Sequence, residues 1–180
     1  MSTTAHAATG SSAERALLIY ASSEPGSPHF SADCLWRTKF RAPDPIYYIE
    51  IEGRGILIAS SLEYTRAQKE AKNIEVLLLD DLLKDVKEPA TSRDAIIQFL
   101  VSRGIRHIKI PAILPYVLGQ VLEKDFELES VRGSMFPERA TKTSWEVQEI
   151  IKAGAAVRAA LDDIRELLAA SEIVDDEVHF

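Results

Sequence analysis

The chain has 180 residues, of which 46% are hydrophobic and 27% charged, a composition typical of a globular domain long enough to bury one core. Its net charge of -7 gives no electrostatic basis for binding nucleic acid, and no apolar run approaches the ~20 residues of a membrane-spanning helix. The single cysteine, Cys34, excludes an internal disulfide and is typical of a reducing compartment, so we expect a cytoplasmic protein.

The chain up to Ala59 is expected to form strands joined by loops. Residues 1–13 are rich in Ser, Thr and Ala without the apolar segment of a signal peptide, so we expect a disordered tail. A short apolar run at 16–20 predicts a buried strand. The β-branched and aromatic run 46–51, the glycine-containing turn 52–55 and the apolar run 56–59 together predict a β-hairpin.

The segment that leads into this hairpin gathers unusual side chains. Trp36, Arg37, Lys39 and Phe40 come just before two prolines, Pro43 and Pro45, and prolines this close predict an extended, rigid connector. Aromatic and basic residues on a stiff connector suit contact with a ligand or a domain interface, although many such loops are only structural.

After the hairpin, helices and strands alternate. Ser60 with Glu63 forms a capping-box pattern that predicts a helix start, Thr91 with Asp94 three residues on opens the next helix, and Gly104 is placed to end that helix. Further strands are predicted at 74–79, 105–110 and 126–131, with a helix from Pro115 to Lys124 between the last two. The predicted fold class is α/β, with a mixed β-sheet of about five to six strands and helices packed on it.

The last segment differs, because it predicts one long C-terminal helix. Thr143 and Glu146 form a further capping box, and an apolar stripe follows at Val147, Ile150, Gly154, Val157, Leu161, Ile164 and Leu168. The stripe predicts either a dimerising coiled coil or the first helix of a second domain. Gly154 in the seam and the short repeat favour the second interpretation.

Motifs that carry chemistry are absent from the sequence. There is no phosphate-binding loop, nucleophile elbow or His-Glu-x-x-His motif. His29 and Cys34 are too few ligands for a structural zinc site, and His107 suits a packed or edge position. Cys34 is expected to be a buried, inert thiol, and the acidic run 175–177 a solvated terminus. We therefore expect no catalysis by this chain alone.

The order of several stretches resembles the amino-terminal domain of Xaa-Pro aminopeptidases and their prolidase and creatinase relatives. These stretches are Ala32-Asp33, TKFRAPDP at 38–45 and SSLEYTRA at 60–67. Residues 138–150 resemble the family's stretch that opens the first helix of the pita-bread catalytic domain. The resemblance implies a creatinase-type α/β domain at 14–138, and a linker and first helix of a missing catalytic domain at 139–180.

The resemblance also implies where the chemistry lies. Relatives hold two divalent metal ions, usually manganese, cobalt or zinc, on Asp, His and Glu residues of the pita-bread domain, and they cleave bonds to proline. Those ligands would lie beyond Phe180, so the resemblance assigns no catalytic, cofactor-binding or metal residue here. The implied partners are the chain's own C-terminal catalytic domain, further copies of the chain in a homo-oligomer, and proline-containing peptides as substrates.

Within this chain the resemblance points to a wall of the substrate cleft or an oligomer interface. Asp33 stands where some relatives place an acidic residue that faces the cleft, and Trp36, Arg37, Lys39 and Phe40 follow it. Lys39 departs from the glycine common at its position in relatives. The implied function is an accessory domain that shapes substrate access. The alternative is a stand-alone binding or scaffold module dimerised by its C-terminal helix.

Overall fold

The computed structural model describes residues 14–179, so the expected disordered tail at 1–13 lies outside the described residues. The chain forms two compact units that divide after Pro137. The first unit contains β1 (Arg15–Ala21), α1 (Ala32–Thr38), β2 (Ile46–Ile51), β3 (Arg54–Ala59), α2 (Ser61–Glu70), β4 (Glu75–Leu78), α3 (Leu79–Leu83), α4 (Ser92–Ser102), β5 (His107–Pro111), α5 (Tyr116–Leu122) and β6 (Glu127–Val131).

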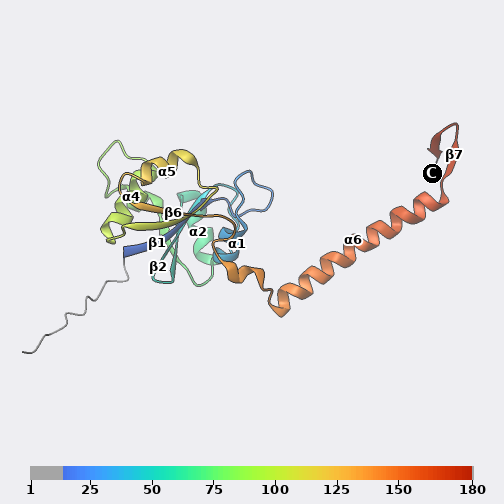
Figure 1. Cartoon of the computed structure of the whole chain (residues 1–180), viewed down its shortest axis with the longest axis horizontal. Helices are drawn as coiled ribbons and strands as arrows, with labels where there is room; N and C mark the ends of the chain where they lie inside the picture. Colours follow the sequence, from blue (N-terminus) through green and yellow to red (C-terminus); the bar gives the residue numbers. More distant parts are fainter. Residues whose placement is uncertain (1–13, 180) are drawn as a thin grey trace, which may run out of the picture. The chain divides into compact units, whose positions relative to one another are not determined.

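A six-stranded sheet in the order β4-β3-β2-β1-β5-β6 forms the centre of the first unit (Figure 1). The pairs β1–β2 and β2–β3 are antiparallel, whereas β3–β4, β1–β5 and β5–β6 are parallel. Because helical segments separate most of the parallel strands along the chain, helices pack on the sheet. The predicted mixed α/β fold is confirmed.

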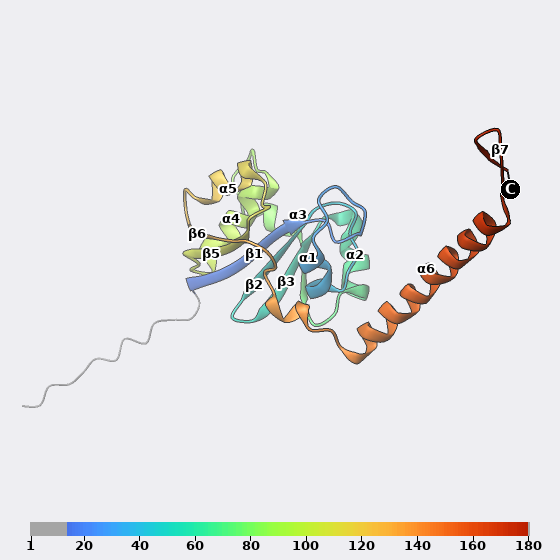
Figure 2. The same ribbon diagram turned by 45° about the vertical axis from the view of Figure 1, so that its right-hand side comes forward.

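Each face of the sheet has its own apolar core, as the alternation of side chains along a strand requires. Leu18 points into the core beneath α3, α4 and α5, and its neighbour Ile19 points into the opposite core with residues of α1 and α2 (Figure 2). Tyr48 and Phe40 belong to this second core, and both are fully buried. The second core therefore lies behind the segment that carries the predicted site residues.

The predicted hairpin is confirmed, with one correction about its glycines. Glu52 and Gly53 both have positive φ, 51° and 75°, as a two-residue type I′ turn requires. Gly55 lies in β3 rather than in the turn. A Cβ atom at Gly55 would lie 3.1 Å from the ring of Tyr48 and 3.2 Å from Ile74. Gly55 therefore allows close packing and does not supply turn geometry.

The extended connector predicted before the hairpin is wrong for residues 32–38, which form α1. The Ser31 side chain caps this helix by accepting a hydrogen bond from the N–H of Cys34 at 3.2 Å. The helix ends because Lys39 adopts a left-handed conformation with φ of 54°, and its N–H bonds the carbonyl of Leu35 at 2.8 Å. The prolines Pro43 and Pro45 lie beyond this end and do not prevent the helix.

The two helix starts predicted in the first unit are confirmed, but the capping box forms at α4 and not at α2, where the sequence predicts it. Thr91 and Asp94 bond reciprocally at the start of α4, and Gly104 after the helix has a φ of +71°. Ser60 precedes α2, but its side chain makes no capping hydrogen bond. The carboxylate of Glu63 instead pairs with Arg66 one turn later. The carboxylate that a capping box would use is therefore engaged elsewhere.

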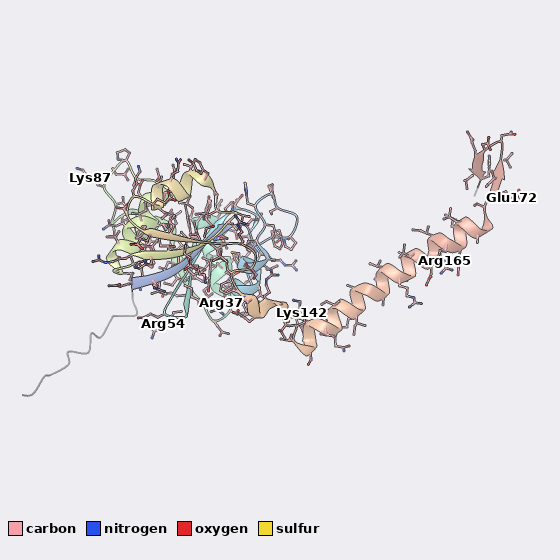
Figure 3. The ribbon with its side chains drawn as sticks, viewed as in Figure 1. Arg37, Arg54, Lys87, Lys142, Arg165 and Glu172 are labelled. Atoms are coloured by element: carbon pink, nitrogen blue, oxygen red, sulfur yellow. The ribbon has the colours of Figure 1, made fainter. Side chains whose placement is uncertain are left out.

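The second unit consists of α6 (Ser144–Ala170) and a small hairpin, after a short 3-10 helix, η2 (Pro137–Ala140), at the junction. The predicted capping box of Thr143 and Glu146 forms, which confirms the start of the long helix. None of the described residues of α6 is buried, and the side chains project all round it in Figure 3. The predicted stripe is exposed along its length, with Val157 at 62% and Leu161 at 55%.

The acidic run at 175–177 is part of a hairpin that the sequence did not indicate. Strand β7 (Glu172–Val174) pairs antiparallel with β8 (Glu177–His179). Asp175 and Asp176 form the turn with φ of 51° and 65°. Aspartate tolerates the left-handed region, so two aspartates supplied turn geometry where their charge suggested only a solvated terminus.

Candidate functional site

The candidate site is built on α1 and the residues that follow it. Of the predicted site residues, Asp33, Trp36 and Arg37 lie within α1, and Lys39 and Phe40 follow directly. Successive side chains on a helix point in directions about 100° apart around its axis, so these residues do not all face the same way. The structure accordingly divides the predicted set into inward and outward residues.

Asp33 is one of the inward residues and joins α1 to a distant segment. Its side chain is buried, with 8% exposed, and its carboxylate accepts hydrogen bonds from the hydroxyl of Ser134 at 2.6 Å and the N–H of Met135 at 2.7 Å. Hydrogen bonds to a carboxylate are stronger than neutral ones. Asp33 therefore fixes the 134–136 segment against α1 across a separation of about a hundred residues in sequence.

The hydrogen bonds that Asp33 accepts from Ser134 and Met135 position the neighbouring Phe136 beside α1. Its ring lies 5.7 Å from that of Trp36 and 6.2 Å, edge to face, from that of Tyr48. The guanidinium of Arg37 lies 5.2 Å from the centre of the same ring. Phe136 thus supports both outward side chains of α1 from beneath. No local pattern in the sequence predicts this role, because the contacts span some hundred residues.

Arg37 is further fixed by a polar cluster with β2. Its Nε donates to the Tyr48 hydroxyl and to Glu50, both at 2.9 Å, and its Nη2 lies 2.7 Å from the Glu50 carboxylate. The Tyr48 hydroxyl donates to Glu50 at 2.6 Å. Burial, and then the hydrogen bond to Glu50, raise the pKa of Tyr48 above its ordinary value, so this hydroxyl stays protonated at neutral pH. The cluster holds the Arg37 side chain in one position.

The outward residues line a cavity of about 580 Å³, which we call the α1 pocket. Its walls come from the end of α1, the β2–β3 hairpin and the connection between α2 and β4. The lining residues are Trp36, Arg37, Lys39, Tyr48, Gly53, Gly55, Lys72, Asn73 and Ile74. Lys39 projects over Trp36, with its Nζ 5.1 Å from the ring centre. Three of the five predicted site residues therefore meet in one cavity.

Phe40, like Asp33, does not line this pocket. It is fully buried in the core, and the guanidinium of Arg66 lies 4.5 Å from the centre of its ring. The N–H of Phe40 donates a hydrogen bond to the hydroxyl oxygen of Thr38 at 3.2 Å. Phe40 and Asp33 thus hold the end and the start of α1 from behind, and Trp36, Arg37 and Lys39 face the cavity.

The other residues considered from the sequence do not line the α1 pocket. Cys34 is fully buried as predicted, and burial, together with the nearby charge of Asp33, raises the pKa of its thiol to about 12. His29 lines a separate apolar cavity of about 330 Å³. Within residues 14–179 there is no cluster of three or more His, Cys, Asp or Glu side chains that could hold a metal ion.

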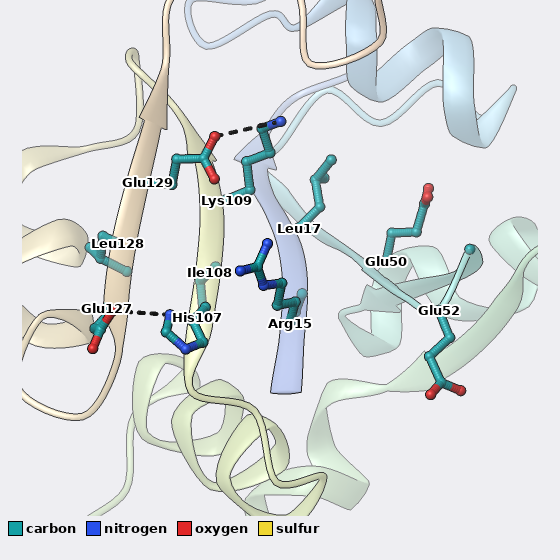
Figure 4. Close-up of a pocket in the computed structure, with 12 residues that line it drawn as sticks. Arg15, Leu17, Glu50, Glu52, His107, Ile108, Lys109, Glu127, Leu128 and Glu129 are labelled. Atoms are coloured by element: carbon teal, nitrogen blue, oxygen red, sulfur yellow. Dashed lines mark ion pairs between the residues drawn. The ribbon is translucent and has the colours of Figure 1, made fainter. Parts of the chain in front are cut away.

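A second charged cavity of about 480 Å³ lies over β1, β5 and β6, and Gly53 lines it as well as the α1 pocket. Figure 4 shows Glu127 and Glu129 of β6 reaching His107 and Lys109 of β5, at 3.0 Å and 3.6 Å. The sequence predicts a packed or edge position for His107, but β5 lies between β1 and β6 and is not an edge strand; His107 opens this strand and is half-buried. Acids and bases pair across the strands in this cavity, whereas no carboxylate is among the residues that line the α1 pocket.

Comparison with solved structures connects this fold to one group of enzymes. The chain aligns with an Xaa-Pro dipeptidase from Bacillus anthracis over 84% of its length, with a TM-score of 0.61 and 15% identity. The fold is shared with Xaa-Pro peptidases. An X-Pro aminopeptidase from Thermotoga maritima gives a TM-score of 0.60 at 16% identity over 84% of this chain, and a prolidase from Pyrococcus horikoshii gives 0.54 at 21% over 87%.

The chain spans only about two fifths of these enzymes: it covers 38% of the dipeptidase, 41% of the aminopeptidase and 42% of the prolidase. No protein-family model and no curated protein matches the sequence. The likeness therefore concerns the fold.

No helix among the described residues combines the length and apolar character that crossing a membrane requires.

Proposed function

We propose that this chain is the accessory lobe of an Xaa-Pro peptidase and works with a catalytic domain that hydrolyses peptide bonds to proline. The observation that carries the proposal is the alignment of 84% of the chain with part of an Xaa-Pro dipeptidase at a TM-score of 0.61. The resemblance of the 32–45, 60–67 and 138–150 stretches to this family supports it independently, because it rests on residues rather than on backbone.

The proposal assigns the metal centre to the catalytic domain. The described residues do not fit such a centre, since they contain no cluster of potential ligands. In relatives with two divalent ions, the metals supply an activated water and polarise the scissile carbonyl. A metal pair does not by itself select substrates by length or by their ends, and a second domain can do so by narrowing the cleft and placing charge there.

The α1 pocket is the part of this chain that we propose contributes to the cleft or to a subunit interface. Trp36, Arg37 and Lys39 offer aromatic area and positive charge at one place. Asp33 supports them through Phe136, so its role in the proposal is to position the wall of the cleft. Residues held this firmly by buried contacts suit recognition, which depends on preorganised side chains.

The α6 stripe is the surface that we propose packs on the catalytic domain. Ile150, Val157, Leu161, Ile164 and Leu168 each have more than half of their surface exposed. A helix with a continuous apolar stripe gains most of its stability from packing that stripe against another element. The buried, unpaired Cys34 supports a cytoplasmic location for the assembly.

The same exposed stripe favours one alternative, a scaffold module that dimerises through α6. The two functions make opposite predictions about the coding sequence. Under the main proposal, the codons after Phe180 encode the Asp, Asp, His, Glu, Glu ligand set. Under the alternative, a stop codon follows.

Activity provides the biochemical test of the main proposal. The 180-residue chain with added Mn²⁺ should not hydrolyse an Xaa-Pro dipeptide, whereas the product of the extended reading frame should do so. Hydrolysis by the 180-residue chain, after removal of contaminating peptidases, would contradict the assignment of the metal centre to another domain. A reading frame that ends at Phe180 would favour the scaffold.

A further inference from the structure

The α1 pocket has a charge opposite to that of the protein as a whole. The chain carries a net charge of -7, yet the described residues that line the pocket include three cations, Arg37, Lys39 and Lys72, and no carboxylate. A concave site lined by one sign of charge concentrates the field and attracts ligands of the opposite sign. The pocket is therefore suited to an anionic group.

Its cations do not all serve the same purpose. Arg37 is engaged by Glu50 at 2.7 Å and by Tyr48 at 2.9 Å, so its charge is largely balanced and it acts as a fixed wall. Lys39 and Lys72 are both exposed and carry the remaining positive charge. The N–H of Lys72 bonds the carbonyl of Thr38 at 3.3 Å, which ties together the two sides of the pocket that bear these lysines.

The backbone at Lys39 provides an independent reason to regard its side chain as functional. Lys39 has a φ of 54°, a conformation that glycine adopts without steric cost and lysine does not. A strained residue that is not glycine is a reason to look for a use of its side chain. Here the ammonium group lies 5.1 Å from the centre of the Trp36 ring, beside the open cavity.

The pocket also offers apolar and neutral polar surface. Trp36 and Ile74 provide apolar walls, and the amide side chain of Asn73 can donate a hydrogen bond. Asn73 is itself left-handed, with a φ of 55°. A bare inorganic ion would use the charge but leave the apolar walls without contact, whereas a carboxylate attached to an apolar body would use both.

We propose that the α1 pocket binds a carboxylate carried on an apolar body, such as the carboxyl end of a short peptide. Lys39 and Lys72 supply the charge, Trp36 covers the apolar part, and Arg37 with Glu50 and Tyr48 forms a rigid wall. This inference rests on the walls and charge of the pocket, and it holds or fails independently of the proposed peptidase role.

Tryptophan fluorescence gives a direct test on the full chain. The sequence has two tryptophans, and Trp145 lies in α6, so Trp145→Phe leaves Trp36 in the pocket as the single reporter. The probes are N-acetyl-leucine and N-acetyl-leucinamide, which differ only in the carboxylate, and inorganic phosphate. We expect a saturable change with the acid, at least about tenfold weaker binding of the amide and of phosphate, and weakening by salt.

Variants connect the signal to the lysines. Lys39→Gln combined with Lys72→Gln should raise the Kd for N-acetyl-leucine by about tenfold or more, whereas the control Lys69→Gln, on an exposed part of α2, should leave it unchanged. Circular dichroism verifies that each variant is folded. Absence of a saturable signal, equal binding of acid and amide, binding of phosphate as tight as that of the acid, or an unaffected double variant would each overturn the inference. The inference about the α1 pocket would not be affected if no assay detected Xaa-Pro hydrolysis.

Discussion

Replacing Asp33 tests whether the α1 site is held from behind as the structure indicates. In Asp33→Ala the N–H of Met135 and the hydroxyl of Ser134 lose a charged acceptor in a buried position. A hydrogen bond to a charged group contributes about 1.5–3 kcal/mol, and a buried donor left without a partner costs about 1–3 kcal/mol. These terms overlap, so we expect the free energy of unfolding to fall by about 3 kcal/mol.

The assay is urea unfolding followed by Trp36 fluorescence in a Trp145→Phe background, which reports the first compact unit alone. Asp33→Asn keeps an acceptor oxygen in place and should lose about half as much. The matched control is Asp44→Ala, which removes an exposed carboxylate from the same stretch of chain and should change stability by no more than about 0.5 kcal/mol. If Asp33→Ala is as stable as Asp44→Ala, the connection from α1 to Phe136 does not hold the site and the reasoning is refuted.

Three further predictions follow from single features. Lys39→Gly should raise the free energy of unfolding by up to about 1 kcal/mol, because glycine adopts a φ of 54° without strain, although it loses the contact with Trp36. A lower thermal midpoint for this variant would contradict the prediction. Cys34 should not react with a thiol reagent at pH 8 until the protein unfolds, and rapid labelling of the native protein would show that the thiol is accessible. The free energy of unfolding should decline as the pH rises above 9.0, the ordinary pKa of the thiol, towards its pKa of about 12 in the folded protein. Leu161→Lys should reduce self-association of the 180-residue chain in sedimentation, whereas Arg158→Lys should not. If the unsubstituted chain sediments as a monomer, the apolar stripe of α6 does not drive self-association.

The elements that the sequence predicted correctly have short-range signals. The capping pairs Thr91–Asp94 and Thr143–Glu146 each act within one helical turn, and the hairpin turn is set by Glu52 and Gly53. The same kind of signal failed at Ser60, whose side chain makes no capping hydrogen bond, and Glu63 there pairs with Arg66. A capping pattern therefore predicts a helix start more reliably than it predicts the hydrogen bonds of the cap.

Helix α1 could not be predicted because its end depends on a rare conformation. A glycine after Thr38 would have indicated a helix terminus, and Lys39 occupies that place with a positive φ. The hairpin of β7 and β8 was missed for a related reason, since Asp175 and Asp176 adopt turn geometry usually associated with Asn or Gly.

The candidate site itself was only half predictable. Composition and order brought attention to Trp36, Arg37 and Lys39, and these residues do meet in one cavity. Phe136 packs against Trp36 and Lys72 lines the cavity, but both come from segments far from α1 in the sequence. Contacts of this range depend on sheet topology, and periodicity within a single segment carries no information about them.

The most direct test of the proposed function is to isolate the native protein with an antibody raised against residues 14–137. Its mass and its hydrolysis of an Xaa-Pro dipeptide, with and without a metal chelator, are then measured on the same sample. We predict a polypeptide or complex with a mass more than twice 20.0 kDa, and hydrolysis that the chelator abolishes. A native species of 20.0 kDa that brings no such activity with it would contradict the assignment.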